Sequence, residues 1–322
     1  MSLKKVSQAI KRNKRFLIAS HINPEGDSLG SQLAMSYLLR LLGKDVVIVS
    51  DDTVTSEYGF LPGLKRIKNV KQIPNLSTFD CLVLLDCSNL SRCGRVKDFK
   101  KNCRLFINID HHISNDNFAD VNWVDPKASS TCEMVYRLFK QFKVPLNRDS
   151  ALCIYVGIMT DTGSFHYSNT TAFTHRTVAE LMNYNLNISQ IYRQIYENVP
   201  IRDMLFLGRL ISNIRTAAQG KIVWLAIKDV WVSQCASYDL TERILTLMRQ
   251  IRGAEVAVLF KALAGKKEVR VNFRSQGKLD VNKVASFFGG GGHHSASGAT
   301  VKGSLTMVQR KVIAELKSRL KV

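Results

Sequence analysis

The sequence lacks an apolar run long enough to cross a bilayer. A spanning helix needs about 18 or more consecutive apolar residues, and no run approaches that length. The N-terminal segment MSLKKVSQAIKRNKRFLIAS has basic residues but too short an apolar core for a secretory signal. Internal repeats and low-complexity segments are also absent. We therefore expect a globular protein that stays in the cytoplasm and contacts no membrane.

The sequence also lacks closely paired cysteines. The chain has seven cysteines, and none shows the CxxC spacing of zinc sites or redox motifs. Several lie inside apolar runs, where a reduced thiol packs as a small hydrophobic side chain. We expect all of them to be thiols: Cys81, Cys87, Cys93, Cys103, Cys132, Cys153 and Cys235.

Acidic residues are scarce relative to basic ones. There are 26 Asp and Glu against 46 Lys and Arg, which gives a formal charge of +20. Residues 191–322 hold 22 basic and 9 acidic side chains, whereas residues 1–190 hold 24 and 17. A surplus of this size favours polyanionic partners, either nucleic acid or phosphorylated small molecules. A basic but otherwise ordinary surface is the alternative.

Short apolar runs alternate with helical stretches in the first half of the chain. The runs RFLIAS, DVVIVSDD, CLVLLD and LFINID have strand character, and a helix is expected from about Ser28 to Leu42. Runs that are apolar on both faces suit parallel strands covered by helices on each side. The pattern predicts an α/β fold whose first domain is a doubly wound, mainly parallel sheet.

The rest of the chain predicts a smaller α/β domain. A long helical region from about Ala172 to Leu210 is expected to break near Pro200. It is followed by the strand KIVWLAI, a helix near LTERILTLMRQI, the hairpin VAVLFKALAGKKEVRVNFRS and a final helix from about Ser304. The expected boundaries are 1–192 for the first domain, 193–217 for a helical linker and 218–322 for the second domain.

Acidic and histidine side chains follow the predicted strands, where ligands bind in open parallel sheets, and Asp161 follows the predicted helix ALCIYVGIMT. Each of them alone is typical of a helix cap or a solvated turn. Several carboxylates that converge repel one another, and a divalent cation removes that cost. Mixed carboxylate and imidazole ligands suit an octahedral ion such as Mn²⁺, and there are enough of them for two ions. The candidates are His21, Glu25, Asp27, Asp86, Asp110, His111, His112 and Asp161.

Five segments together resemble the motifs of the DHH phosphoesterase family. HINPEGDSLGS resembles the first motif, Asp86 in LLDCSN the second, Asp110-His111-His112 the signature triplet and Asp161 in DTGSF the fourth. FGGGGHHSASGA is similar to the glycine-rich motif of the DHH-associated C-terminal domain. The resemblance covers nearly the whole chain. In size and layout it is most similar to the bacterial oligoribonuclease and pAp phosphatase type, often called nanoRNase.

The resemblance implies two divalent cations, with Mn²⁺ expected and Mg²⁺ or Co²⁺ as alternatives. It implies that Asp86 bridges the two ions. One ion would be held by His21 and Glu25. The other would be held by Asp27, His111 and Asp161.

The remaining roles also come from the resemblance. His112 would face the substrate phosphate, and Asp110 would orient a neighbouring histidine. Glu25 departs from the motif, which often has Asp at this position, although the longer side chain can still reach a metal. The ions would activate a water for in-line attack on phosphorus.

The second domain is expected to bind substrate. Glycines without Cβ let backbone N–H groups approach a phosphate, and His293 would add a side-chain ligand. Arg270 and Arg274 alternate along a predicted strand, so both can face the substrate. A flexible loop and a solvated strand face are the alternatives. The glycines of this candidate site are Gly290, Gly291 and Gly292.

The leading hypothesis is a metal-dependent hydrolase with its active site in the cleft between the two domains. It would remove nucleoside monophosphates from the 3′ end of very short RNA and convert 3′-phosphoadenosine 5′-phosphate (pAp) to AMP. A phosphodiesterase for linear or cyclic dinucleotides, of the pApA or c-di-AMP type, is the related alternative. A non-catalytic RNA-binding module is the alternative from another class. The expected partners are short RNA or phosphorylated nucleotides, and a homodimer is left open.

Overall fold

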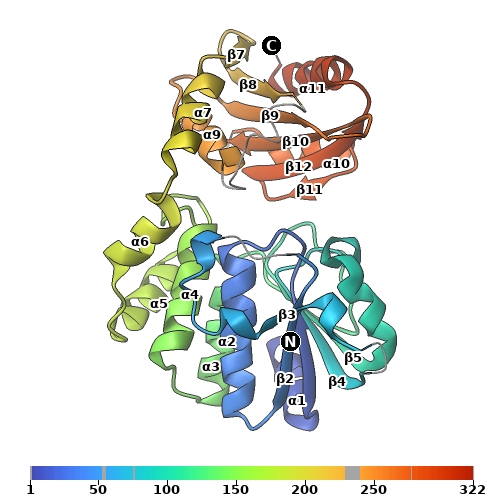
Figure 1. Cartoon of the computed structure of the whole chain (residues 1–322), viewed down its shortest axis with the longest axis vertical. Coiled ribbons are helices and arrows are strands. Elements are labelled where there is room, and N and C mark those ends of the chain that lie inside the picture. The colour runs from blue at the N-terminus through green and yellow to red at the C-terminus, as the bar shows by residue number, and fades with distance from the viewer. Residues whose placement is uncertain (1, 53–55, 75–76, 229–239, 277, 322) are drawn as a thin grey trace. The chain divides into compact units, whose positions relative to one another are not determined.

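The chain folds into two compact units, each with its own β-sheet (Figure 1). A computed structural model describes residues 2–52, 56–74, 77–228, 240–276 and 278–321. The units are Met1–Asn198 and Val199–Val322, so helix α7 (Ile201–Ile211), which falls within the predicted linker, belongs to the second unit. Within the described residues, no helix is both long enough and apolar enough to cross a membrane.

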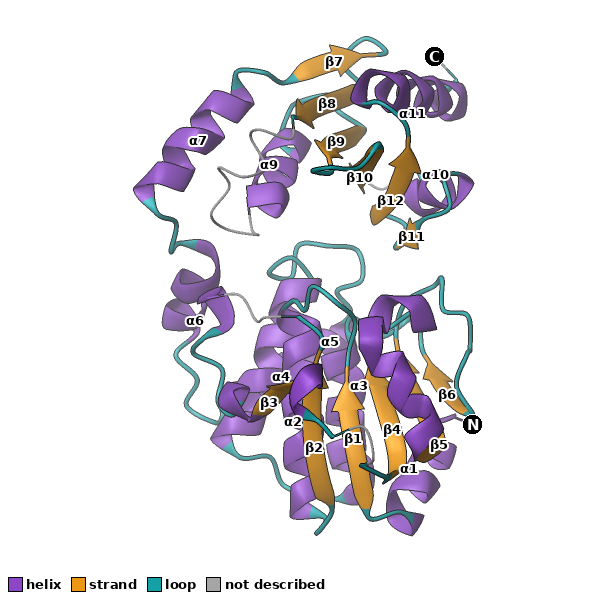
Figure 2. Ribbon diagram, turned by 45° about the vertical axis from the view of Figure 1, so that its right-hand side comes forward, coloured by secondary structure: helices purple, strands orange, loops and turns teal. Residues whose placement is uncertain are grey.

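The first unit holds a six-stranded sheet in which all neighbouring strands run parallel (Figure 2). The strand order is β3-β2-β1-β4-β5-β6, so the order reverses beside β1. In doubly wound sheets, ligands bind beyond the carboxyl ends of the strands at this reversal. The strands are β1 (Arg15–Ala19), β2 (Asp45–Ser50), β3 (Ile67–Asn69), β4 (Phe79–Leu85), β5 (Cys103–Asp110) and β6 (Val121–Val124).

Both faces of this sheet are buried, which confirms the predicted doubly wound α/β domain. Phe16 and Ile18 of β1 pack in the core formed with the α-helices. Leu17, which points to the opposite face, packs with Val96 and Phe99 of the 3₁₀ segment η4 (Leu90–Asn102). The helices of this unit are α1 (Ser2–Arg12), α2 (Gly26–Leu41), α3 (Thr131–Phe142), α4 (Arg148–Asp161), α5 (Ala172–Met182) and α6 (Ile188–Tyr196). Short 3₁₀ turns are η1 (Ser56–Tyr58), η2 (Leu64–Arg66) and η3 (Val70–Gln72).

The region expected as one helical stretch broken near Pro200 is in fact three helices, α5, α6 and α7. An additional break lies at residues 183–187. The side chain of Asn187 accepts the backbone N–H of Gln190 at 3.0 Å and caps the N-terminus of α6. A cap of this kind starts a new helix, which the apolar pattern alone does not indicate.

The described cysteines are thiols, as predicted. None of the six forms a disulfide. Five are buried and Cys103 is half-buried. Cys235 lies outside the described residues.

The second unit holds a mixed six-stranded sheet of order β11-β12-β10-β9-β8-β7. Strands β8 and β9 are parallel, and the other pairs are antiparallel, including the predicted hairpin of β9 and β10. The strands are β7 (Arg215–Ala217), β8 (Ile222–Ile227), β9 (Val256–Ala262), β10 (Glu268–Ser275), β11 (Gly291–Gly292) and β12 (Ala296–Lys302). The helices besides α7 are α9 (Leu240–Arg249), α10 (Val281–Phe287) and α11 (Leu305–Leu320).

The two faces of this second sheet are covered differently. One face packs its apolar side chains, such as Val271 and Phe273, against α10 and α11. On the other face, Leu259 of β9 packs with α7 and α9. The alternate residues of β10 and β12 belong to this other face, where they are exposed or half-buried. We call this set the polar face: Glu268, Arg270, Asn272, Arg274, Gly298, Thr300 and Lys302.

Candidate metal centre

The carboxyl ends of β1 and β4 bring the first two predicted ligands together. His21 follows β1 and Asp86 follows β4, and His21 Nε2 lies 3.3 Å from Asp86 Oδ2. His21 Nδ1 lies 2.7 Å from the carbonyl oxygen of Ile22. A proton on Nδ1 satisfies that carbonyl and directs the lone pair of Nε2 toward Asp86. Both side chains are buried, with His21 7% and Asp86 5% exposed.

Asp86 lies at the middle of the centre. Its φ of 55° is in the left-handed region, which is uncommon for a residue other than glycine and typical of functional positions. Its Oδ1 lies 3.7 Å from His111 Nε2 and 3.6 Å from His112 Nδ1. Together with His21, one carboxylate therefore faces three imidazole rings.

Asp27 is held by the N-terminus of another helix. Helix α2 begins at Gly26 rather than near Ser28, so Asp27 lies in its first turn. The Asp27 carboxylate accepts the backbone N–H groups of Thr131 at 2.7 Å and Cys132 at 2.8 Å. These are the first N–H groups of α3, which have no partner inside that helix. The start of α3 thus fixes this carboxylate in place.

His111 connects the remaining carboxylates. Its Nε2 lies 3.4 Å from Asp161 Oδ2 and 3.9 Å from Asp27 Oδ2. Its Nδ1 lies 3.3 Å from the carbonyl oxygen of Ala128. Asp161 is the last residue of α4 rather than following the helix, and Asn169 donates to its Oδ2 at 3.4 Å. Strand β5 and helices α2 and α4 therefore each contribute to one cluster.

Asp110 and His112 form a hydrogen-bonded pair beside this cluster. His112 Nδ1 lies 2.7 Å from Asp110 Oδ1, and Asp110 is fully buried. The Asn115 side-chain amide donates to Asp110 Oδ2 at 2.6 Å and to Asn108 Oδ1 at 2.8 Å. Burial alone would raise the pKa of Asp110, but the charge and the hydrogen bond of His112 outweigh it and lower the pKa. The ionised Asp110 fixes the orientation of the His112 ring.

Two residues of this arrangement were not identified from the sequence. Asn115 lies in a loop, where Asn is common. A signal for Asn115 was available in Asn108. Asn108 is a polar residue in a strand with both faces buried, so its side chain needs a hydrogen-bonding partner. Gly157 lies inside α4, where a Cβ would come within 2.8 Å of Asp27 Oδ1 and 2.2 Å of Cys132 Sγ. Glycine there allows α4 to approach the centre closely.

The potential ligand atoms gather in two buried groups that share one residue. The first group is Asp27, Asp86 and His111, and the second is Asp86, Asp110 and His112. In each group the ligand atoms lie within 4.8 Å of one another. Asp86 is the shared member. Because Asp110 and His112 of the second group are expected to orient and contact the substrate rather than a metal, the bridging role that the resemblance implies for Asp86 stays a prediction.

The side chains of the centre concentrate negative charge. Burial and the charge of Asp86 raise the pKa of Asp27 to about 6. Burial also raises the pKa of Asp161 well above its usual range. Burial alone would lower the pKa of His111, but the charges of Asp161, Asp27 and Asp86 outweigh it and raise the pKa to about 9. Protons or cations must therefore balance these carboxylates.

Glu25 is the least buried of the predicted ligands. It is exposed and serves as the N-cap residue of α2, and its backbone N–H donates to Ser28 Oγ at 2.8 Å. Burial is the main cause of the raised pKa of Asp161, and the charge of Glu25 adds to it. Glu25 therefore lies within electrostatic reach of the cluster, and its role as a ligand stays a prediction.

The glycine-rich segment of the second unit packs closely on β12. A Cβ at Gly290 would lie 2.1 Å from the carbonyl oxygen of Gly298. The N–H of Gly290 donates to the Ala285 carbonyl at 2.8 Å, and the N–H of His293 donates to the Ala296 carbonyl at 2.7 Å. These two N–H groups are used within the fold. Close backbone packing is thus the first reason for glycine here, and phosphate binding stays a prediction.

Both predicted arginines lie on the polar face of β10. A Cβ on Gly298 would lie 2.9 Å from Arg270 Nη2, so the Arg270 guanidinium lies over this glycine. Arg270 Nη1 lies 3.4 Å from Thr300 Oγ1. Because Gly298 pairs with Gly291, Arg270 lies beside the glycine-rich segment. Arg274 is half-buried, and its Nη1 donates to the preceding backbone carbonyl at 3.0 Å.

Comparison with known proteins identifies the family. The model of the DHH family, N-terminal domain, matches residues 15–158, and the DHHA1 domain matches residues 216–321. A Thermus thermophilus protein named bifunctional oligoribonuclease and PAP phosphatase NrnA is 30% identical over 307 residues, 94% of this chain and 89% of that protein. The chain belongs to the DHH family. Within this DHH chain, the N-terminal match includes every predicted metal ligand except Asp161.

A further relative agrees with this assignment, and a solved structure shares the fold. The Mycoplasma pneumoniae protein of the same name is 30% identical over 321 residues, 96% of this DHH chain and 94% of that protein. The crystal structure of an exopolyphosphatase-related protein from Bacteroides fragilis superposes with a TM-score of 0.88 at 24% identity. That comparison covers 100% of this chain and 98% of the other, and it supports the fold alone.

Proposed function

We propose that this DHH family member is a two-cation phosphoesterase. The observation that carries the proposal is the position of Asp86: its Oδ2 faces His21, which is predicted to hold one ion, and its Oδ1 faces His111, which is predicted to hold the other. Its carboxylate lies 3.3–3.7 Å from three imidazole nitrogens. A carboxylate with two oxygens turned toward separate sets of ligands is suited to bridge two cations.

The residues of the centre fit the cations that the family implies. Carboxylate oxygens come from Asp27, Asp86 and Asp161, and imidazole nitrogens come from His21 and His111. Oxygen and imidazole donors suit Mn²⁺ and related divalent ions, whereas structural zinc sites are rich in thiolates. We propose Mn²⁺ as the working ion, with Mg²⁺ and Co²⁺ as alternatives.

The proposed chemistry is phosphoester hydrolysis. Bound cations would activate water and stabilise negative charge on the phosphoryl oxygens. His112 would face a phosphoryl oxygen of the substrate, because Asp110 holds its ring in a fixed orientation. Asn115 would keep Asp110 in place through the 2.6 Å bond to Oδ2. Burial of these groups limits the access of bulk water and strengthens their electrostatic interactions.

We propose very short RNA, hydrolysed from its 3′ end, as the main substrate and pAp as a second one. The names of relatives aligned over most of their length support this choice. Arg270 and His293 would hold a phosphate of the substrate, since a guanidinium binds phosphate through two N–H groups. Arg274 and the segment Gly290–Gly292 would complete the substrate site. A site formed between the two units, a cytoplasmic location and a homodimer stay predictions.

Product analysis tests this function. Purified protein with Mn²⁺ is offered RNA of two to five nucleotides, long single-stranded RNA, pAp and pApA in parallel. We expect the short RNAs to yield mononucleotides and pAp to yield AMP. Turnover of pApA alone would agree with the proposed metal chemistry but would contradict short RNA and pAp as the substrates. Binding of RNA without turnover, indifferent to Mn²⁺ and to chelators, would instead favour the non-catalytic RNA-binding module.

A further inference from the structure

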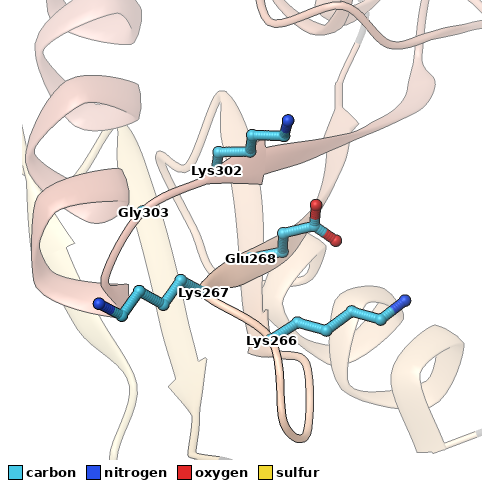
Figure 3. Close-up of a pocket in the computed structure, with 5 residues that line it drawn as sticks. All are labelled: Lys266, Lys267, Glu268, Lys302 and Gly303. Carbon is cyan, nitrogen blue, oxygen red and sulfur yellow. The ribbon is translucent and has the colours of Figure 1, made fainter.

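A hollow lined by lysines lies at one end of the second sheet, away from the glycine-rich segment (Figure 3). Its volume is about 630 Å³. It forms where the turn between β9 and β10 meets the end of β12, because the N–H of Gly303 donates to the Lys267 carbonyl at 2.8 Å. The residues that line it are Lys266, Lys267, Glu268, Lys302 and Gly303. We call it the lysine hollow.

The lysine hollow has a surplus of positive charge. Lys266, Lys267 and Lys302 are exposed, and Glu268 is half-buried. None of the three ammonium groups forms an ion pair with any residue that the structure describes. Figure 3 shows the Glu268 carboxylate on the same side as the ends of Lys266 and Lys302, while Lys267 points the other way. On that side, two positive charges against one negative charge leave a surplus that attracts an anion.

The hollow and the glycine-rich segment share strand β12. Gly298 pairs with Gly291 and lies beneath the Arg270 guanidinium. Lys302 lies four residues further along the strand and pairs with Glu268. At about 3.3 Å per residue, this separation is roughly 13 Å, and residues two apart lie on the same face. Lys302 and Arg270 therefore mark two basic positions along one polar face.

This spacing suits a nucleic acid strand better than a single small anion. Successive nucleotides of a stacked strand advance by about 3.4 Å, so roughly 13 Å corresponds to about four nucleotides. Thr300 lies between Gly298 and Lys302 on the same face, and its hydroxyl lies 3.4 Å from the Arg270 guanidinium. The surplus of basic residues in this half of the chain, 22 against 9, matches a polyanion.

We propose that the lysine hollow is an accessory phosphate-binding site for single-stranded RNA longer than about four nucleotides. The inference rests on the proposed function, because it takes RNA as the substrate and the glycine-rich segment as the place where a terminal phosphate is held. An RNA of two nucleotides and pAp are too short to reach the hollow. The hollow thus makes the affinity of the enzyme depend on RNA length.

The test compares substrates of different length in a triple variant, Lys266→Gln, Lys267→Gln and Lys302→Gln. We expect KM for an eight-nucleotide RNA to rise about tenfold near 0.1 M salt, with KM for a dinucleotide and for pAp unchanged. The matched control removes two exposed lysines of α11 and the exposed lysine at its C-cap: Lys311→Gln, Lys317→Gln and Lys321→Gln. Since α11 covers the opposite face of the sheet, this control should keep the wild-type length dependence.

A binding measurement adds a readout that needs no catalysis. With EDTA present to prevent hydrolysis, the Kd of a fluorescent eight-nucleotide RNA is measured at several salt concentrations. Each phosphate contact contributes about 0.7 to the slope of log K against log salt, so the loss of Lys266 and Lys302 should reduce the slope of the hollow variant by about 1.4.

Two outcomes would overturn the accessory site. Equal slopes in the hollow variant and the α11 control would show that only overall charge matters. A rise in KM that is the same for two and eight nucleotides would show that the hollow does not discriminate length. The wild type could hydrolyse no RNA and still bind it with a steeper salt dependence than the hollow variant. In that case the proposed function fails while the accessory site stands.

Discussion

The two units place their candidate functional groups in opposite environments. In the first unit, the central side chains of the site are buried, and each has named partners: Asp27 accepts two N–H groups of α3, and Asp110 is fixed between His112 and Asn115. In the second unit, Arg270 and Lys302 are exposed on a strand face. A buried charge without partners is costly, so the first site tolerates few changes. Exposed basic groups bind a polyanion additively, and each contributes a little.

The comparison predicts that changes in the first unit affect turnover and metal binding, whereas changes in the second unit affect substrate affinity. The largest expected effect is that of Asp86→Ala. We expect kcat to fall by about 10³-fold or more, because the variant removes the carboxylate that faces both His21 and His111. Steady-state assays with short RNA and Mn²⁺ measure this, and circular dichroism checks that the fold is retained. Wild-type turnover would refute the site assignment.

The next effect is that of Asn115→Ala. This change removes the amide that donates to Asp110 at 2.6 Å and should loosen the His112 ring. We expect kcat to fall by about 10- to 100-fold with KM and the bound metal nearly unchanged, as for residues that orient a catalytic group. Asn117→Gly is the control, since Asn117 is exposed and its φ of 52° suits glycine. Loss of bound Mn²⁺ in Asn115→Ala would contradict a positioning role.

A smaller effect is expected from Gly298→Ala in the second unit. The new Cβ would lie 2.9 Å from Arg270 Nη2 and would push the guanidinium off the glycine-rich segment. We expect KM for short RNA to rise by about five- to tenfold, with kcat within about twofold of the wild type. Arg270→Ala should give the same pattern. Gly208→Ala on α7, where a Cβ meets no atom within 4 Å, is the control. A fall in kcat without a rise in KM would contradict the prediction that changes in the second unit affect substrate affinity.

The smallest effect concerns stability. Cations that bind only the folded first unit stabilise it by about 2.7 kcal/mol at a concentration 100 times Kd. EDTA should therefore lower Tm of the first unit by roughly 5–10 °C, and excess Mn²⁺ should restore it. Differential scanning calorimetry resolves this transition. In Asp86→Ala the addition of EDTA should change Tm little, whereas an equal shift in both proteins would place the stabilising metal elsewhere.

The sequence predicted best those parts of the site that follow regular strands. His21 and Asp86 come directly after β1 and β4, and the rule that parallel strands present ligands at their carboxyl ends brought them together correctly. The motif also predicted that Asp110 orients a neighbouring histidine, and in the structure that histidine is His112. Neither inference needs the details of side-chain packing.

Contacts between distant segments were not predictable in this way. Thr131 and Cys132 bond to Asp27 although about 100 residues separate them, because α3 happens to start at this carboxylate. The need for Gly157 appears only once α4 is packed against that contact. The break between α5 and α6 was missed because a local cap, Asn187, overrides the apolar periodicity. Such features depend on tertiary packing, which hydrophobic patterns do not encode.

The number of cations bound per chain tests the central claim most directly. Isothermal titration calorimetry with Mn²⁺, checked by elemental analysis after dialysis, measures it for the wild type and for Asp86→Asn, which keeps the size of the side chain. We predict two Mn²⁺ per wild-type chain and weakened binding of both in Asp86→Asn, because the Asp86 carboxylate faces His21, predicted for one ion, and His111, predicted for the other. A single ion in the wild type, or two ions bound with unchanged affinity in the variant, would contradict a centre bridged by Asp86.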